Sequence, residues 1–349
     1  MTLATLTVPD VAAVNRTFGT SLRAEDFQVF PAPPRYGTLR RAMRTQGALL
    51  DICLTMRLAQ NVDREQHFDL LFSTENEADF GRRGISYVHF PWVYLPRPEV
   101  EMRWFHRIPG VLNGYRVFCQ RIARSSNEGL RRNLMLANSK FVARHIQAVH
   151  GIGSTVLYPP VAGGFPDVPW ERRKQGFVAI GRFTACKRWD MAVSIIEEVR
   201  RRGHDVTLTL IGSRDDAAWY DRLAAMAGEH PWFRMKSDIS RAELAEEVAS
   251  HRYGIHTMEC EHFGLAPAEI QRAGGIVFVH RSGGPMEIVG EDPRLMFENV
   301  SDAADKIARV LESPDECADV QRQLTAQRGK FSEEVFCSSL RDIAERFMA

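Results

Sequence analysis

Short apolar strands that alternate with amphipathic helices constrain the fold of this chain more than any other feature. The clearest series lies in the C-terminal half, where FVAIG (177–181), VTLTLIG (206–212), YGIHTM (253–258) and IVFVH (276–280) are candidate buried strands. Between the first two, residues 187–202 carry apolar side chains at helical spacing. Strands that alternate with helices favour an α/β fold with a parallel, doubly wound sheet.

The N-terminal half has the same alternation in a weaker form. TLATLTV (2–8) is a candidate strand, and PDVAAVNRTF (9–18) follows it as a helix whose first turn holds a proline and an aspartate. Further candidate strands are FDLLFST (68–74), SYVHF (86–90) and LMLANS (134–139). We therefore predict a second parallel sheet in this half.

A segment rich in proline and glycine, residues 157–170, separates the two series and is typical of a linker. With 349 residues, the chain exceeds one ordinary core, and two domains of roughly 150–180 residues are expected. We predict an N-terminal Rossmann-like domain over 1–163 and a second over 164–330. Residues 331–349 are predicted to form an amphipathic helix that crosses back to the N-terminal domain.

Composition excludes several classes of protein. Lys+Arg number 45 against 44 for Asp+Glu, which argues against bulk nucleic-acid binding. The six cysteines form no C-x-x-C pair, which favours reduced thiols over a disulfide framework or a zinc site. No apolar run approaches the ~20 residues of a membrane span, and the N-terminus lacks signal-peptide features. We expect a cytoplasmic protein.

The segment EHFGLAPAE, which begins at Glu261, is the strongest candidate site. Phe263, Gly264 and Leu265 would present backbone N–H groups at the start of a helix, where phosphate binds readily. Gly264 would let a ligand approach the backbone closely, and Glu269, one turn inside the helix, could bind a ribose. Two glutamates at this spacing can also be ordinary surface residues, but their position between a strand and a short helix favours a ligand site.

The segment GRFTACKRWD follows the strand FVAIG directly and contains Arg182 and Lys187. Two cations at this position could neutralise a diphosphate leaving group. Ordinary solvated charges are the alternative. A cation near a helix N-terminus is unfavourable for the helix dipole, and an anionic ligand would explain its placement.

Two further features remain open between a functional and a structural role. His89, in SYVHFPW, lies at a strand end and could contact a ligand, or it could be a hydrogen-bonded structural histidine. Gly283 and Gly284, in HRSGGPMEIVG, could donate backbone hydrogen bonds to a ligand or form a plain tight turn.

These segments resemble the family-4 retaining glycosyltransferases of the GT-B fold. HTMECEHFGLAPAEIQRAG looks like the E-x7-E motif of that family, and GRFTACKRWD looks like its G-R-x-x-x-x-K phosphate-binding turn. LANSKFVARHIQAVHGIGSTVLYPPV is similar to the last strand–helix unit and linker of its N-terminal domain. IHTM, EHFG, SGGP and YVHFP together are similar to eukaryotic mannosyltransferases that extend lipid-linked oligosaccharides from GDP-mannose.

The resemblance implies two Rossmann-like domains that face a central cleft, and it implies roles for individual residues. Arg182 and Lys187 would contact the donor diphosphate, and Glu269 would bind the nucleotide ribose. Glu261 would hold the sugar near the reacting centre, and His89 would lie near the sugar as well. Backbone contacts to the sugar or phosphate would come from the three residues at the helix start, Phe263, Gly264 and Leu265.

The resemblance also implies metal-independent transfer of a hexose from a nucleotide sugar to an acceptor hydroxyl, with retention of configuration. GDP-mannose is the expected donor, with UDP-glucose or UDP-GlcNAc as alternatives. We expect a departure from the family at the start of the sequence: TLATLTV would correspond to the second strand of the family, and the first strand–loop–helix unit would be absent. A non-catalytic nucleotide-sugar-binding subunit, completed by a partner, is the alternative. A dinucleotide oxidoreductase is disfavoured because no G-x-G-x-x-G follows a strand.

Residues 97–132 combine arginines with aromatic residues. Such a segment can bind an anionic membrane surface or an acceptor phosphate. We therefore predict a glycan or lipid-linked acceptor and peripheral contact with the inner face of a membrane. A basic, solvated helix face packed by its own aromatic side chains is the alternative.

Overall fold

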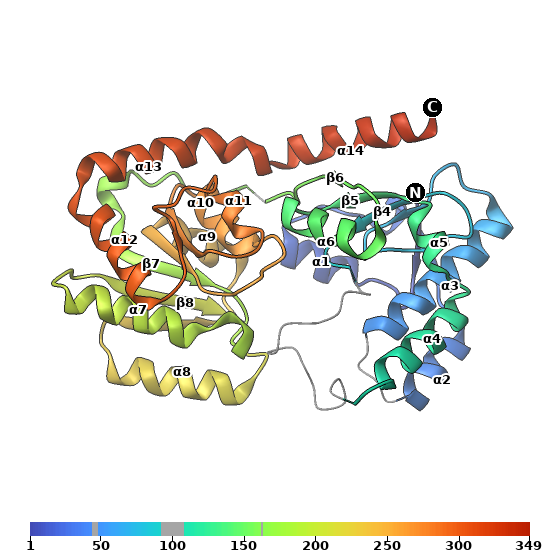
Figure 1. Ribbon diagram of the computed structural model, residues 1–349, viewed down its shortest axis with the longest axis horizontal. Coiled ribbons are helices and arrows are strands. Elements are labelled where there is room, and N and C mark those ends of the chain that lie inside the picture. The colour runs from blue at the N-terminus through green and yellow to red at the C-terminus, as the bar shows by residue number, and fades with distance from the viewer. Residues whose placement is uncertain (44–47, 92–107, 162) are drawn as a thin grey trace. The chain divides into compact units, whose positions relative to one another are not determined.

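The computed structural model describes residues 1–43, 48–91, 108–161 and 163–349, and it divides into two compact units (Figure 1). The first unit comprises Met1–Asn138, Val142–Val156 and Ile343–Ala349. The second comprises Ser139–Phe141 and Leu157–Asp342. No helix of the described residues is long and apolar enough to cross a membrane.

The second unit is built on a six-stranded, wholly parallel sheet in the order β12-β11-β10-β7-β8-β9. Its strands are β7 (Lys174–Ile180), β8 (Thr207–Gly212), β9 (Phe233–Ser237), β10 (His251–His256), β11 (Ile276–His280) and β12 (Met296–Phe297). The order runs outward in both directions from the neighbouring strands β7 and β10. In sheets of this kind, ligands bind beyond the carboxyl ends of the strands where the order reverses.

Helices cover both faces of this sheet. In Figure 1, α7 and α8 lie below the sheet and α9 and α10 lie above it, while α12 packs against α7. The helices of this half of the chain are α7 (Trp189–Arg201), α8 (Ala217–Glu229), α9 (Arg241–Ala249), α10 (Leu265–Arg272), α11 (Pro285–Ile288), α12 (Val300–Glu312), α13 (Pro314–Gln327) and α14 (Glu333–Met348), of which the last runs on into residues of the first unit. The predicted doubly wound parallel sheet is confirmed for this half.

The core of the second unit forms because α7 turns its apolar side chains toward the sheet. Trp189, Ile196 and Val199 are buried, as the helical spacing in residues 187–202 predicts. The indole Nε1 of Trp189 donates a hydrogen bond to the carbonyl oxygen of Arg182 at 3.0 Å. The core therefore also fixes the loop that follows β7.

The first unit has a four-stranded parallel sheet, in the order β3-β4-β5-β6, and a separate parallel pair, β1-β2. The strands are β1 (Thr2–Thr5), β2 (Gln28–Pro31), β3 (Phe72–Ser73), β4 (Ile85–Val88), β5 (Leu134–Ala137) and β6 (Thr155–Val156). The predicted strands over 2–8, 68–74, 86–90 and 134–139 are all present, although each is shorter than its predicted range. The second parallel sheet is confirmed.

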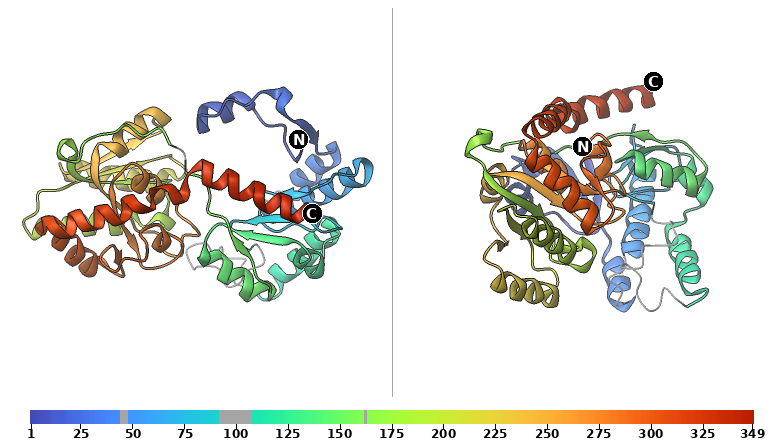
Figure 2. Two further views of the ribbon diagram at one scale, coloured as in Figure 1. Left: turned by 90° about the horizontal axis from the view of Figure 1, so that it is seen from above. Right: turned by 60° about the vertical axis from the view of Figure 1, so that its left-hand side comes forward.

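Six helices of the described residues belong wholly or mainly to the first unit. They are α1 (Val11–Phe18), α2 (Pro34–Met43), α3 (Ala48–Gln66), α4 (Val111–Ala123), α5 (Asn127–Arg131) and α6 (Lys140–His150). Asp10 caps α1 by accepting a hydrogen bond from the backbone N–H of Ala13 at 2.9 Å. Helices α3 and α4 pack side by side (Figures 1 and 2). Buried residues of α3, such as Leu50, Leu54 and Met56, form much of this unit's core.

We expect Gly212→Ala to destabilise the second unit. A Cβ at Gly212, the last residue of β8, would lie 1.8 Å from the carbonyl oxygen of Gly181. A backbone oxygen cannot rotate away, so the free energy of unfolding should fall by about 1–3 kcal/mol or more. Urea unfolding followed by tryptophan fluorescence measures this change.

Gly228→Ala is the matched control, because a Cβ at this position in α8 meets nothing within 4 Å. Alanine favours a helix over glycine by roughly 0.5–1 kcal/mol, so this variant should unfold at the same or a higher urea concentration. Equal stability of the two variants would contradict the packing described for Gly212.

Candidate functional site

The candidate site lies in the second unit, beyond the carboxyl ends of the neighbouring strands β7 and β10. After β7, the chain passes through Gly181 and Arg182 to a short 3-10 turn that ends at Lys187. After β10, the chain passes through Glu261 to the start of α10. The two segments singled out in the sequence therefore lie at the point where the strand order reverses, as expected for a ligand site in such a sheet.

An ion pair joins the two loops. The ammonium Nζ of Lys187 lies 2.7 Å from the carboxylate Oε2 of Glu261, and the two side chains are only 14% and 18% exposed. The hydroxyl of Thr257 lies 2.8 Å from the carbonyl oxygen of Lys187 and 3.0 Å from that of Arg188. Arg188 itself forms a salt bridge with Glu259. The positions of both charges are thus set by contacts between the loops.

Burial and charge act against each other on Glu261. Burial raises the pKa of its carboxyl group, but the nearby Lys187 and His256 more than offset this effect, so the net shift is downward. Glu261 is therefore a carboxylate at neutral pH. Its charge is balanced mainly by Lys187, which is the cation in direct contact with it.

His256, the last residue of β10, lies directly behind this ion pair. Its side chain is almost completely buried, and its Nε2 lies 3.7 Å from Oε2 of Glu261. Burial lowers the pKa of His256 to about 4, so the imidazole is neutral at pH 7. Within the described part of the chain, Nε2 has no hydrogen-bond partner. The sequence analysis did not identify this residue, although its position five residues before Glu261 was a usable signal.

The start of α10 requires glycine at its N-cap. Gly264 has a φ of 98°, and a Cβ there would lie 2.8 Å from the ring of Pro267 and 3.0 Å from that of Pro285. Its two neighbours differ in environment. Phe263 is buried against Tyr158 and Phe331, whereas the side chain of Leu265 is 54% exposed.

Gly283 and Gly284 form a tight turn that packs against the Glu261 loop. A Cβ at Gly283 would lie 2.2 Å from the carbonyl oxygen of Glu261, and one at Gly284 would lie 2.3 Å from that of His262. The backbone N–H of Gly284 donates to the carbonyl oxygen of Glu261 at 2.8 Å. These glycines therefore hold the loop that carries Glu261.

Glu269 is paired with a residue that the sequence analysis missed. Its carboxylate accepts a hydrogen bond from Nη1 of Arg241 at 2.5 Å, and it is 16% exposed. Burial raises the pKa of Glu269, although Arg241 acts in the opposite direction. The guanidinium of Arg241 also lies over the ring of Phe165, 5.5 Å from its centroid. Arg241 opens α9, where a cation is unfavourable for the helix dipole, and that placement was a signal for a nearby anion.

Arg182 is more open to solvent than the other charged residues of the β7 loop. Its side chain is 63% exposed and lies 3.6 Å from the carboxylate of Asp215. A contact of this length between exposed groups contributes little stability. Arg182 can therefore turn toward a ligand at little cost.

His89 belongs to the first unit, unlike the other predicted site residues. It follows β4 and is exposed, and its Nε2 lies 2.9 Å from the carbonyl oxygen of Thr74. Its backbone N–H donates to the side chain of Asn76 at 2.8 Å. Both contacts fix the local conformation of the residue. They fit the structural alternative, and a ligand contact of His89 stays a prediction.

The described residues contain no group of three or more His, Cys, Asp or Glu side chains that could hold a metal ion. The charged groups of the candidate site are instead cations and carboxylates in pairs. Such an arrangement can bind a ligand that carries negative charge and hydroxyl groups. Of the segment 97–132, residues 97–107 lie outside the described residues.

Comparisons with known proteins support this view of the second unit. Residues 165–326 match the family described as Glycosyl transferases group 1. The GDP-Man:Man(3)GlcNAc(2)-PP-Dol alpha-1,2-mannosyltransferase of Mus musculus is 28% identical over 228 residues, which cover 58% of this chain and 46% of the relative. The chain thus spans about half the length of the curated relatives it matches.

Solved structures agree on the fold of the whole chain. WaaG, a glycosyltransferase involved in lipopolysaccharide biosynthesis, is 12% identical with a TM-score of 0.61, over 95% of this chain and 89% of its own. Sucrose-phosphate synthase from Thermosynechococcus elongatus is 14% identical with a TM-score of 0.63, over 99% of this chain and 87% of its own. The chain has the GT-B fold with two Rossmann-like units, and it carries a domain of the group 1, or family-4, glycosyltransferases.

We expect His256 to make folding sensitive to acid. In the unfolded chain His256 would take up a proton near its ordinary pKa of 6.5, whereas in the folded protein it does so only at about 4. The unfolded state therefore binds more protons between these values, and the free energy of unfolding should fall as the pH falls from 6.5 to 4. The full effect is on the order of 3 kcal/mol.

His256→Gln removes this proton uptake, so its stability should depend less steeply on pH over the same interval. Urea unfolding of both proteins at several pH values between 7 and 4 measures the difference. Glu261, Lys187 and His280 act on His256 in the folded state and are retained in the variant. Identical pH slopes for the two proteins would show that His256 titrates normally in the folded protein.

Proposed function

We propose that this chain, through its group 1 glycosyltransferase domain, binds a nucleotide sugar and transfers the hexose to an acceptor hydroxyl with retention of configuration. The observation that carries the proposal is the Lys187–Glu261 ion pair beyond the adjoining strands β7 and β10. A cation supplied by one strand end and a carboxylate supplied by the other suit a ligand with a diphosphate and a sugar. The transfer itself is proposed to need no metal ion.

Lys187 and Arg182 are proposed to bind the donor diphosphate. When the glycosidic bond to the phosphate breaks, negative charge develops on the leaving nucleoside diphosphate, and fixed cations stabilise it. Arg182 is available because it is exposed and only loosely paired. Lys187 must partly exchange its contact with Glu261 for one with phosphate, since an ammonium group has three donors to share. The leaving phosphate is proposed to take the proton of the acceptor hydroxyl.

Glu261 is proposed to hold the transferred sugar near the reacting carbon. It is a largely buried carboxylate whose loop is held by Gly283 and Gly284. A carboxylate can accept hydrogen bonds from sugar hydroxyls, and its negative charge would favour the positive charge that develops on the sugar during transfer. Backbone groups of Phe263, Gly264 and Leu265 are proposed to add main-chain contacts at the start of α10.

Glu269 and Arg241 are proposed to form the ribose end of the site. The Glu269 carboxylate has acceptor capacity beyond its one hydrogen bond to Arg241 and can accept from ribose hydroxyls. Nη2 of Arg241 is buried and makes no hydrogen bond within the described residues. It therefore offers an additional donor to the nucleotide. His89 remains a proposed contact to the sugar.

The donor is proposed to be GDP-mannose, because the curated relatives of the chain are named as mannosyltransferases that use it. A UDP-sugar is the alternative. For the same reason, the acceptor is proposed to be a glycan linked to a lipid, which would bring the protein to a membrane surface. The cytoplasmic location stays a prediction.

We expect the intact chain to bind one class of nucleotide diphosphate selectively and Arg182→Ala to weaken that binding. Loss of one charged hydrogen bond to phosphate costs about 1–3 kcal/mol, which is roughly a tenfold or greater rise in Kd. Thermal shift and calorimetric titration with GDP, UDP, ADP and their sugars measure both effects.

Arg234→Ala is the control, because Arg234 is an exposed arginine on the outer strand β9. This variant should retain the wild-type Kd. A panel in which no nucleotide shifts the melting temperature would refute donor binding. Donor binding without any transfer would instead favour the non-catalytic subunit.

The two glutamates should respond differently to substitution. Glu269→Ala should weaken binding of the nucleotide itself by about 1–3 kcal/mol and so raise its Kd, because the ribose loses a charged hydrogen-bond acceptor. Glu261→Ala should lower kcat more than it raises the Kd of the donor, because its contact is with the sugar. Titration with the nucleotide and a steady-state transfer assay separate the two effects, and the reverse pattern would exchange the proposed roles.

A further inference from the structure

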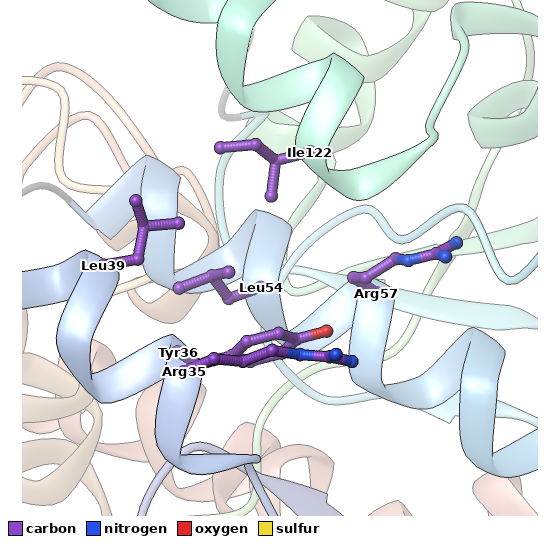
Figure 3. Close-up of a pocket in the computed structure, with 6 residues that line it drawn as sticks. All are labelled: Arg35, Tyr36, Leu39, Leu54, Arg57 and Ile122. Atoms are coloured by element: carbon purple, nitrogen blue, oxygen red, sulfur yellow. The ribbon is translucent and has the colours of Figure 1, made fainter.

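The first unit contains a pocket that the proposed donor site does not use (Figure 3). Its volume is about 460 Å³, which lies within the range of small-molecule sites. Three helices line it, α2, α3 and α4. The lining residues are Arg35, Tyr36, Leu39, Leu54, Arg57 and Ile122.

The pocket has a polar end and an apolar end. In Figure 3 the guanidinium groups of Arg35 and Arg57 point toward the same side as the hydroxyl of Tyr36. Leu54 is buried in the core of the unit. The apolar side chains that complete the other end are Leu39 and Ile122. A ligand that fills this pocket must therefore be charged or polar at one end and apolar at the other.

Among the described residues, no carboxylate forms a salt bridge with the arginines at the polar end. The pKa of Arg57 is lowered, first by burial and then by repulsion from the neighbouring guanidinium groups of Arg124, Arg64 and Arg35. In the described ranges, none of these four residues forms a salt bridge. The one side-chain hydrogen bond found for Arg57 goes to the neutral amide of Gln60, at 3.3 Å.

Arg40 shows that the other arginines of α2 and α3 do not all lack a salt bridge. It lies on α2, as Arg35 does, yet it pairs with Asp51 of α3 at 2.7 Å. Arg40 is thus neutralised, whereas Arg35 and Arg57 have no carboxylate partner in the part of the chain that the structure describes. Four like charges this close together favour an anion, and a doubly charged group more than a singly charged one. Guanidinium groups match phosphate oxygens especially well because they can bind two at once.

We propose that this pocket binds a phosphate ester that carries an apolar chain. The phosphate would lie between Arg35 and Arg57, with the hydroxyl of Tyr36 as a further donor, and the chain would lie on Leu39, Leu54 and Ile122. The proposal does not depend on the proposed transferase activity, because it shares no residue with the donor site. The ligand can be a soluble phosphate ester or the head of a membrane lipid, which have the same chemistry.

Octyl phosphate, used below its micelle concentration, tests the proposal by calorimetric titration into the intact chain. We expect saturable binding that is at least tenfold tighter than that of inorganic phosphate or of octyl glucoside, which has the same chain without the charge. Arg57→Gln and Arg35→Gln should each weaken it at least fivefold. Arg35 is exposed, so its variant keeps the test valid if Arg57→Gln fails to fold. Arg16→Gln, an exposed arginine on α1, is the matched control and should bind as the wild type does.

Ile122→Gln tests the contribution of the apolar end of the pocket separately from that of the polar end. It should weaken octyl phosphate binding and leave the weak binding of inorganic phosphate unchanged. Equal affinity of wild type and both arginine variants for octyl phosphate would overturn the proposal, and so would an affinity for inorganic phosphate as high as for octyl phosphate. Because this titration contains no nucleotide, its failure is distinguishable from failure of the proposed donor site.

Vesicles identify the source of the phosphate. If the wild type sediments with phosphatidic acid vesicles in preference to phosphatidylcholine vesicles, and Arg57→Gln and Arg35→Gln lose this preference, the ligand is a membrane lipid. If octyl phosphate binds but the two variants sediment as the wild type does, the ligand is a soluble ester. Both results support the same chemistry.

Discussion

The ion pair between Lys187 and Glu261 is the interaction on which the geometry of the second unit's strand ends depends. Both groups are largely withdrawn from water, which costs several kcal/mol for each charge unless the two are in good contact. The contact is short only if the loops after β7 and β10 keep a fixed relation. Thr257 provides this on one side by contacting the backbone of the Lys187 turn. On the other side, Gly284 holds the carbonyl of Glu261.

Close backbone contacts are the second constraint, and they explain where glycine is needed. Gly212 lies against the carbonyl of Gly181, so that the ends of β8 and β7 approach more closely than side chains would permit. Gly283 lies against the carbonyl of Glu261 in the same way. In both cases the absence of a side chain lets a loop approach the strand ends closely, and the charged side chains of the site extend from those loops.

Much of this arrangement could be predicted from the sequence, and the limit has a physical reason. Strands β7, β8, β10 and β11 of the second unit are largely buried on both faces, so they appear as mostly apolar runs, and α7 shows a clear apolar stripe. The loops that carry Arg182 and Glu261 follow such strands directly. By contrast, β9 has an exposed residue at every second one of its five positions, and α2 and α3 belong to a weaker series in the first unit. None of these three elements was predicted.

Pairs between distant residues could not be predicted, because spacing along the chain does not encode them. Lys187 and Glu261 are 74 residues apart, and Arg241 and Glu269 meet only because α9 packs against α10. His256 was missed for a related reason: a histidine at a strand end has many possible partners, and only the fold shows that its Nε2 approaches Glu261. The resemblance to a family supplied expected roles for single residues but no knowledge of their partners.

The candidate site of the second unit and the pocket of the first differ in how their positive charges are balanced, and the difference bears on how each can bind a ligand. In the second unit, Lys187 is paired with Glu261, Arg241 with Glu269 and Arg182 with Asp215. A ligand must replace or share these contacts. Its affinity therefore depends more on the correct placement of its phosphate and hydroxyl groups than on its charge alone. In the first unit, the arginines around Arg57 repel one another, and an anion relieves that repulsion wherever it enters the polar end. Such attraction acts at longer range and weakens with salt. Selectivity at the pocket must therefore come from its apolar end, where Leu54 and Ile122 distinguish an ester with a chain from a free anion.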